Sequence, residues 1–202
     1  MRAIYALSGF SLLALVVAIP ARGDTTLTGH FDNVTTGTQD GYDTSSGTYD
    51  IPADTGGTPS ATFDNNTNDG IMVNPATTLN MAGGEIDNNQ DDGIYNFEGT
   101  VNITGGVISG NTFFPLVNNG GTVNIYGTFP GLTPGQVQDI TTNGTTITGT
   151  FENDTTPFSF RLDNSGNVYL HDVAVPEPAS AGLLTVGAVG LLARRRRQSA
   201  TK

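Results

Sequence analysis

The stretch "TVNITGGVISGN", residues 100–111, has close copies on both sides at the same interval. The preceding copy is "TLNMAGGEIDNN" (78–89) and the following one is "TVNIYGTF" (122–129), so Thr78, Thr100 and Thr122 are evenly spaced. In each copy apolar and polar residues alternate, and glycine or polar turns separate the alternating runs. Alternation with a period of two predicts β-strands. Recurrence at a fixed step predicts a stacked architecture.

Strands that recur at this step can wind as successive coils, each lying on the last at the ordinary strand spacing of about 4.8 Å. We therefore predict an all-β fold, a short parallel β-helix with coils of about 22 residues. A fainter copy, "TTITGTF" (145–151), suggests a further coil. Two alternatives stay open. A β-sandwich of hairpins would use the same strands, and a disordered surface segment would suit the low hydrophobicity and high charge.

Stacking would align equivalent residues in ladders. The inward ladders expected in the core pair Val101 with Val123, Ile103 with Ile125, and Ile86 with Ile108. One asparagine column, Asn74, Asn96 and Asn118, is expected at a corner, where side-chain amides can bond to one another and tolerate left-handed backbone.

The pattern changes on either side of the repeats, which we place at residues 61–157. Residues 24–60 are polar and lack a clear repeat, so we expect an irregular acidic cap there. Residues 158–174 alternate on both sides of a turn that contains Asn164 and Gly166. This is a hairpin pattern, and a hairpin would cap the last coil against edge-to-edge pairing.

Residues 1–23 have the features of a secretory signal helix. A basic residue, Arg2, precedes a largely apolar run, and "ARG" at 21–23 places small residues at the cleavage positions. The apolar run is shorter than the roughly 20 residues needed to span a bilayer. We therefore expect cleavage after Gly23.

Residues 175–202 carry a three-part segment. A motif at 175–178 is followed by an apolar stretch at 179–193, expected to be a transmembrane helix, and by a basic tail at 194–202. Arginines after an apolar stretch are retained on the cytoplasmic side. The residues that define the segment are Pro176, Glu177, Pro178, Arg194, Arg195, Arg196 and Arg197.

This order of parts resembles the PEP-CTERM sorting signal of exported bacterial proteins. The resemblance implies recognition by an exosortase-like membrane protease. It also implies a precursor transiently anchored in the membrane, and transfer to the cell surface or extracellular matrix of a Gram-negative-type bacterium, often one that makes exopolysaccharide. It covers only the C-terminal segment that begins at Val175. The signal therefore indicates a destination rather than an activity.

The segment between these ends is strongly acidic. Of the 19 acidic residues only Glu177 lies outside 24–174, and of the eight basic residues only Arg161 lies inside it, which gives a net charge of −17. Such a surface repels nucleic acid and anionic lipid. The chain has no cysteine, so its stability cannot depend on disulfide bonds.

Two acidic turns suggest cation binding. The segments "DNNTNDG" (64–70) and "DNNQDDG" (87–93) place oxygen ligands before a glycine, as a hard cation such as Ca²⁺ prefers. Stacked coils would bring the two turns side by side, where a cation would relieve the repulsion between them. The candidate ligands are Asp64, Asp69, Asp87, Asp91 and Asp92.

Catalytic residues are scarce in this composition. The two histidines, His30 and His171, lie near opposite ends of the acidic segment without a recognisable nucleophile motif. We therefore predict a structural surface protein that is not an enzyme and needs no cofactor, with Ca²⁺ as the one candidate ion. The alternative is a carbohydrate-binding or Ca²⁺-dependent adhesion module, for which Tyr95, Phe97 and Tyr126 are the candidate exposed rings. A small glycan-degrading enzyme is the least favoured hypothesis.

Overall fold

The computed structural model describes residues 24–31, 40–154 and 157–173, and within these ranges every regular element is a β-strand. Most strands belong to three faces, which we call A, B and C. Face A contains β1 (Thr25–Thr26), β4 (Gly47–Ile51), β7 (Thr77–Met81), β10 (Thr100–Ile103), β13 (Thr122–Thr128) and β17 (Asn167–Asp172). Face B contains β2 (Gly29–Phe31), β5 (Ala61–Asp64), β8 (Glu85–Asp87) and β11 (Val107–Ser109). Face C contains β3 (Tyr42–Asp43), β6 (Ile71–Val73), β9 (Ile94–Phe97), β12 (Leu116–Asn119) and β16 (Pro157–Asn164).

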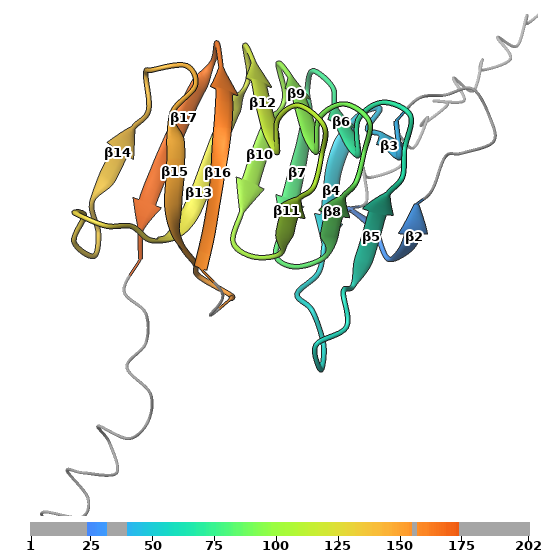
Figure 1. Ribbon diagram of the computed structural model, residues 1–202, viewed down its shortest axis with the longest axis horizontal. Coiled ribbons are helices and arrows are strands. Elements are labelled where there is room, and N and C mark those ends of the chain that lie inside the picture. Colours follow the sequence, from blue (N-terminus) through green and yellow to red (C-terminus); the bar gives the residue numbers. More distant parts are fainter. Residues whose placement is uncertain (1–23, 32–39, 155–156, 174–202) are drawn as a thin grey trace, which may run out of the picture.

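From β2 to β13 the chain visits the faces in the order B, C, A and then starts the next coil (Figure 1). Each strand pairs in parallel with the strand one coil away. Along face A, Thr78, Thr100 and Thr122 are register partners. The step predicted from the repeat is therefore confirmed for β7, β10 and β13, and the stacked strands are parallel rather than joined as hairpins.

Two further strands join the faces at the C-terminal end. They are β14 (Val137–Asp139), which pairs antiparallel with β17, and β15 (Thr146–Phe151), which pairs antiparallel with both β13 and β16. Because β13 lies on face A and β16 on face C, β15 connects these faces into one curled 13-stranded sheet. Face B remains a separate four-stranded sheet.

The interior is filled by ladders of apolar side chains. The predicted pairs Val101 with Val123, Ile103 with Ile125, and Ile86 with Ile108 are register partners and are buried. On face C the corresponding ladder is Ile71, Ile94, Leu116 and Leu162. Burial of these side chains away from water is the main favourable term for such a slender fold.

A buried asparagine ladder lies at the corner between faces C and A. The Asn96 Nδ2 donates to the Asn118 Oδ1 at 2.8 Å, and the Asn118 Nδ2 donates to the Asn164 Oδ1 at 3.0 Å. The prediction that Asn74 belongs to this column is wrong. Val73 is the register partner of Asn96, because the corner between β6 and β7 holds one more residue than the next corner does. Asn74 instead bonds to Thr44.

A second asparagine row runs along the outer side of face A. The amide groups of Asn80, Asn102 and Asn124 are joined head to tail at 2.8 Å. At one end of the row the Asp50 carboxylate accepts a hydrogen bond from the Asn80 Nδ2. At the other end the His171 Nε2 lies 3.0 Å from the Asn124 Oδ1. This row links β4, β7, β10, β13 and β17 along the face.

The predicted irregular cap at 24–60 is wrong in part. The strand β4 pairs with β7 over its full length, so residues 47–51 form a regular rung of face A. The repeat is hidden in the sequence because the register step here, as in Thr48 with Thr78, is longer than the step from Thr78 to Thr100. All but one of the extra residues form the loop between β4 and β5, and the last is the additional residue in the corner between β6 and β7.

The predicted capping hairpin at 158–174 is also wrong. The strands β16 and β17 pair with β12 and β13, not with each other, so the turn at Asn164 is a coil corner. Likewise, "TTITGTF" forms β15, which runs antiparallel to β13 instead of continuing the repeat. A hairpin turn and a coil corner have the same alternating pattern, and only the available strand edges distinguish them.

The expected signal helix at 1–23 and the expected transmembrane helix at 179–193 lie outside the described residues. None of the described segments is an apolar helix of membrane-spanning length.

Candidate functional site

A ladder of aspartates lies where the chain passes from face B to face C. An Asp-Gly pair precedes β3, β6 and β9 in successive coils, so Asp40, Asp69 and Asp92 stack. The Asp40 Oδ1 accepts the Asp69 N–H at 3.1 Å, and the Asp69 Oδ1 accepts the Asp92 N–H at 3.0 Å. The Asp92 Oδ1 accepts the Phe114 N–H at 2.9 Å. Each carboxylate thus bonds the backbone of the following coil.

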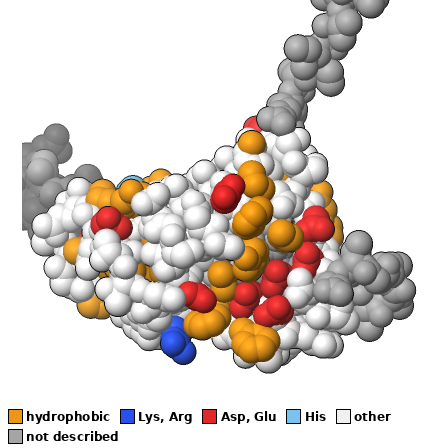
Figure 2. All heavy atoms as spheres, turned by 90° about the horizontal axis from the view of Figure 1, so that it is seen from above, with side chains coloured by type: hydrophobic (Ala, Val, Ile, Leu, Met, Phe, Trp, Pro, Cys, Tyr) orange, Lys and Arg blue, Asp and Glu red, His pale blue; other side chains and the backbone are white. Residues whose placement is uncertain are grey.

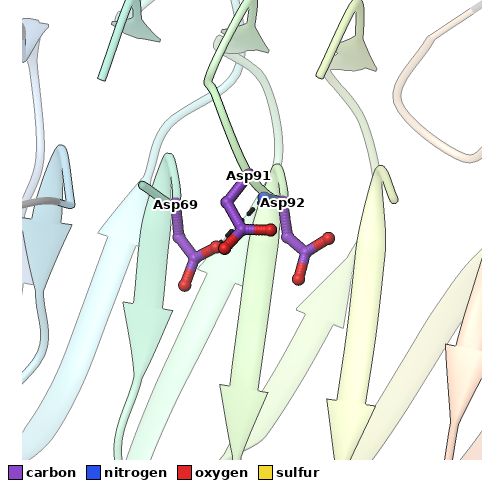
Figure 3. Close-up of side chains that lie close together, drawn as sticks. All are labelled: Asp69, Asp91 and Asp92. Atoms are coloured by element: carbon purple, nitrogen blue, oxygen red, sulfur yellow. Dashed lines mark hydrogen bonds between the residues drawn. The ribbon is translucent and has the colours of Figure 1, made fainter. Parts of the chain in front are cut away.

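Asp91 completes a group of three carboxylates with Asp69 and Asp92. One ligand oxygen from each residue lies within 4.8 Å of the other two, and the described residues contain no other such acidic or histidine group. Figure 3 shows the three side chains at the ends of neighbouring strands, with Asp92 turned toward the next coil. Asp69 is 4% exposed and Asp92 7% exposed. Oxygen ligands at this spacing suit a hard cation, or they can share protons.

Burial governs the acidity of this group. It raises the pKa of Asp69 to about 7, against the opposing effect of the Asp92 N–H, and the charges of Asp40, Asp92 and Asp91 raise it further. Burial likewise raises the pKa of Asp92 to about 6, opposed by the Phe114 N–H and reinforced by Asp91 and Asp163. Both carboxyls therefore hold their protons more tightly than solvent-exposed carboxyls do.

The remaining two predicted ligands lie elsewhere. Asp64 and Asp87 are register partners on face B, and each accepts a hydrogen bond from the asparagine that follows it. The Asp64 Oδ1 also lies 2.9 Å from the His30 Nε2. Burial and the charge of Asp64 raise the pKa of Asp87. The five aspartates thus form two groups, because the corner between faces B and C separates the two halves of each acidic turn.

The predicted exposed rings do not share one face. Tyr95 and Phe97 both lie on β9 of face C, where Phe97 is 37% exposed. Tyr126 lies on face A and stacks on His171 with ring centroids 4.5 Å apart. Tyr95 instead lines a groove on face C together with Phe113 and Phe114. These two phenylalanines were missed because they lie in a loop without repeat pattern. The available signal was the repeat step, which aligns Phe113 and Phe114 with Asp91 and Asp92 of the preceding coil.

The raised pKa values predict a stability that falls as pH rises. A carboxyl whose pKa is higher in the folded chain than its unfolded value near 3.9 binds its proton more tightly when folded. Its stabilising effect is complete at low pH and is lost as pH rises through about 6 to 7. In chelator, the full-length protein should therefore melt about 5 °C higher at pH 5 than at pH 8.

The substitution Asp69→Asn tests whether the aspartates at the corner between faces B and C cause this difference in melting temperature. Asparagine keeps an oxygen for the Asp92 N–H but carries no charge, so the difference between pH 5 and pH 8 should shrink. Asp139→Asn, on the exposed strand β14, is the matched control and should leave it unchanged. Equal behaviour of the two variants would show that the general acidity of the protein, and not this corner, sets the pH dependence.

Comparison with known proteins identifies one segment of the chain. Residues 174–197 match the family model of the PEP-CTERM protein-sorting motif. The resemblance seen in the sequence is thus confirmed, and it marks an exported protein whose membrane-anchored precursor is processed at the cell surface by an exosortase-like enzyme. No curated protein and no solved structure matches the chain.

Proposed function

We propose that this exosortase-sorted protein is a structural component of the surface or extracellular matrix of a Gram-negative-type bacterium. Its body would be a short parallel β-helix without catalytic activity. The observation that carries the proposal is the continuity of bonding from coil to coil. The buried row from Asn96 to Asn164, the outer row from Asn80 to Asn124 and the aspartate corner each cross several coils.

The two histidines lie away from the three-carboxylate group, which disfavours one catalytic arrangement, a histidine working with these carboxyls. The His30 Nε2 lies against Asp64 on face B, and the His171 Nε2 lies against Asn124 on face A. Neither histidine belongs to the three-carboxylate group at the corner. A general acid or base must lie within hydrogen-bond reach of the group that it serves.

The sorting part of the proposal is tested in a bacterial host that carries an exosortase. The triple substitution Pro176→Ala, Glu177→Ala and Pro178→Ala removes the motif that the enzyme would recognise. We expect the wild-type chain to be shortened and to leave the membrane fraction, and the variant to remain there at full length. Lys202→Ala lies outside the matched segment and should behave as wild type. Release of the triple variant at the wild-type rate would contradict exosortase sorting.

A second candidate function is Ca²⁺-dependent adhesion, favoured by the spacing of Asp69, Asp91 and Asp92. A bound ion stabilises the folded form by about 2.7 kcal/mol when its concentration is 100 times the Kd. Addition of Ca²⁺ at about 10 mM and pH 8 should therefore raise the melting temperature of the wild type by about 5 °C. The rise should vanish at pH 5 and in Asp69→Asn. An identical midpoint in NaCl of equal ionic strength would exclude this candidate.

A further inference from the structure

Aromatic and aliphatic side chains form one part of the lining of the groove on face C. Its volume is about 410 Å³, within the roughly 300–1,000 Å³ of ordinary ligand clefts. Tyr95 and Val117 are register partners on β9 and β12, and Phe113 and Phe114 come from the loop just before β12. In Figure 2 a stripe of apolar side chains crosses this side of the molecule with acidic side chains gathered beside it. Phe113 is 65% exposed, which leaves most of its ring open to a ligand.

Carboxylates line the same groove. Asp163 is the register partner of Val117 on β16, and Asp91 and Asp92 lie at the end of the groove near the loop. Asp92 is 7% exposed, and the one hydrogen bond that its carboxylate makes to a described residue is the bond from the Phe114 N–H to Oδ1. Its second oxygen is thus an acceptor beside the groove with no partner from the described protein. Because the carboxylate is already largely desolvated, this oxygen gains a hydrogen bond from a ligand at little additional cost.

A chain of polar contacts orients the tyrosine at the other end. The Ser165 Oγ lies 3.3 Å from the Asn119 Oδ1, and the Asn119 Nδ2 donates to the Tyr95 hydroxyl at 2.7 Å. The Tyr95 hydroxyl hydrogen is therefore free to point away from Asn119. On the loop side, the Arg161 guanidinium lies 5.2 Å from the centre of the Phe114 ring and helps to hold that ring.

We propose that this groove binds a neutral saccharide chain. Pyranose rings have apolar C–H faces, which pack on aromatic rings such as Tyr95 and Phe113, and rim hydroxyls, which donate to carboxylates such as Asp92 and Asp163. The protein thereby offers both halves of a sugar site on adjacent coils. The inference deepens the proposed function and rests on it, because a matrix protein that binds glycan would be held in the matrix.

The charge of the groove selects among saccharides. The segment 24–174 carries a net charge of −17, and three aspartates lie in the groove itself. Chains of uronic acids or sulfated sugars would bring like charges together and are disfavoured. An apolar protein partner is also a poor fit, because it would bury Asp92 and Asp163 without donors. Neutral hexoses supply donors without adding charge.

The test measures binding of hexasaccharides to the full-length protein, kept in a detergent with a polyoxyethylene head group so that no sugar head group competes. The probes are neutral β-1,4-glucose, β-1,4-mannose and α-1,4-glucose hexamers and an acidic galacturonate hexamer, each followed by calorimetry and tyrosine fluorescence. We expect at least one neutral hexamer to bind and the acidic hexamer not to bind. Phe113→Ala and Tyr95→Ala should each weaken that binding at least tenfold.

The controls separate the groove from the rest of the surface. Tyr126→Ala removes a ring of equal size from face A and should bind as wild type. Because Phe113 is 65% exposed, Phe113→Ala should keep the wild-type melting temperature, so a loss of binding cannot reflect unfolding. Absence of binding by every neutral hexamer, or binding that persists in Phe113→Ala and Tyr95→Ala, would overturn the proposal. Tighter binding of the galacturonate hexamer would also overturn it.

The outcome also distinguishes this inference from the proposed function. Shortening of a bound hexamer during incubation would confirm the groove but contradict the absence of catalysis. Failure of binding would overturn the saccharide groove and leave the sorting experiment and the structural role unaffected.

Discussion

Replacement of Asn118 by alanine should lower the free energy of unfolding by about 3–4 kcal/mol. Asn118 is fully buried at the centre of the inner asparagine ladder. Its Oδ1 accepts a hydrogen bond from the Asn96 Nδ2. Its own Nδ2 lies within hydrogen-bond distance of the Asn164 Oδ1 and of the Gly121 carbonyl oxygen. Alanine would leave several of these buried groups without a partner, at roughly 1–3 kcal/mol each, and would also create a small cavity.

A matched variant on the outer row tests whether burial causes this loss. Asn102 makes the same head-to-tail amide bonds with Asn80 and Asn124, but it is half-buried, so water can replace its partners. Asn102→Ala should cost no more than about 1 kcal/mol. The two free energies are obtained from urea denaturation of the two variants and the wild type. Equal losses would show that the amide bonds themselves, and not their burial, determine the effect.

Replacement of Gly121 by alanine should cost about 3 kcal/mol, although its φ angle is one that any residue can adopt. An added Cβ would lie 2.3 Å from the Asn96 Nδ2 and 2.5 Å from the Gly99 carbonyl oxygen. Both contacts are shorter than van der Waals distances, and the second is to backbone, so the coils would have to separate. The absence of a side chain at this position is what allows two corners to lie on each other.

The neighbouring Gly120 provides the contrast. It has a φ of 82°, but an added Cβ would meet only Glu98 at 3.4 Å. In the two preceding coils the positions equivalent to Gly120 are occupied by Ala76 and Glu98, whose φ angles are 60° and 59°. Gly120→Ala should therefore cost only about 1 kcal/mol. Thermal melts of both variants test whether Gly121→Ala is the more destabilising. A larger loss of stability in Gly120→Ala would mean that backbone strain outweighs the contact between coils at this corner.

The ladders of the middle coils could be predicted because their signal is local and periodic. Period-two alternation tells which side chains point inward, and a constant step along the chain tells which of them meet. The pairs Val101 with Val123 and Ile103 with Ile125 follow directly. Where an inserted residue changes the step between corners, a constant step aligns the wrong residues. For this reason Asn74 was expected in the column position that Val73 occupies.

The site was predictable only in part for a related reason. Asp69, Asp91 and Asp92 come together as expected, because they occupy equivalent acidic turns of adjacent coils. The separation of Asp64 and Asp87 from them depends on where the corner bends the chain. Within one acidic turn the sequence does not mark that bend.

The amino-acid sequence by itself determined the sorting signal, the acidity of the body, the parallel stacking of its middle strands and the inward side of each. These properties depend on composition, on short motifs or on a repeat. The tertiary structure alone decided that β15 runs antiparallel between β13 and β16, and that β16 and β17 continue the stack. It also placed Phe113 beside Tyr95 and Asp163. The strand pairings depend on which strand edge is free to accept hydrogen bonds, and that competition is settled only when the whole chain has folded.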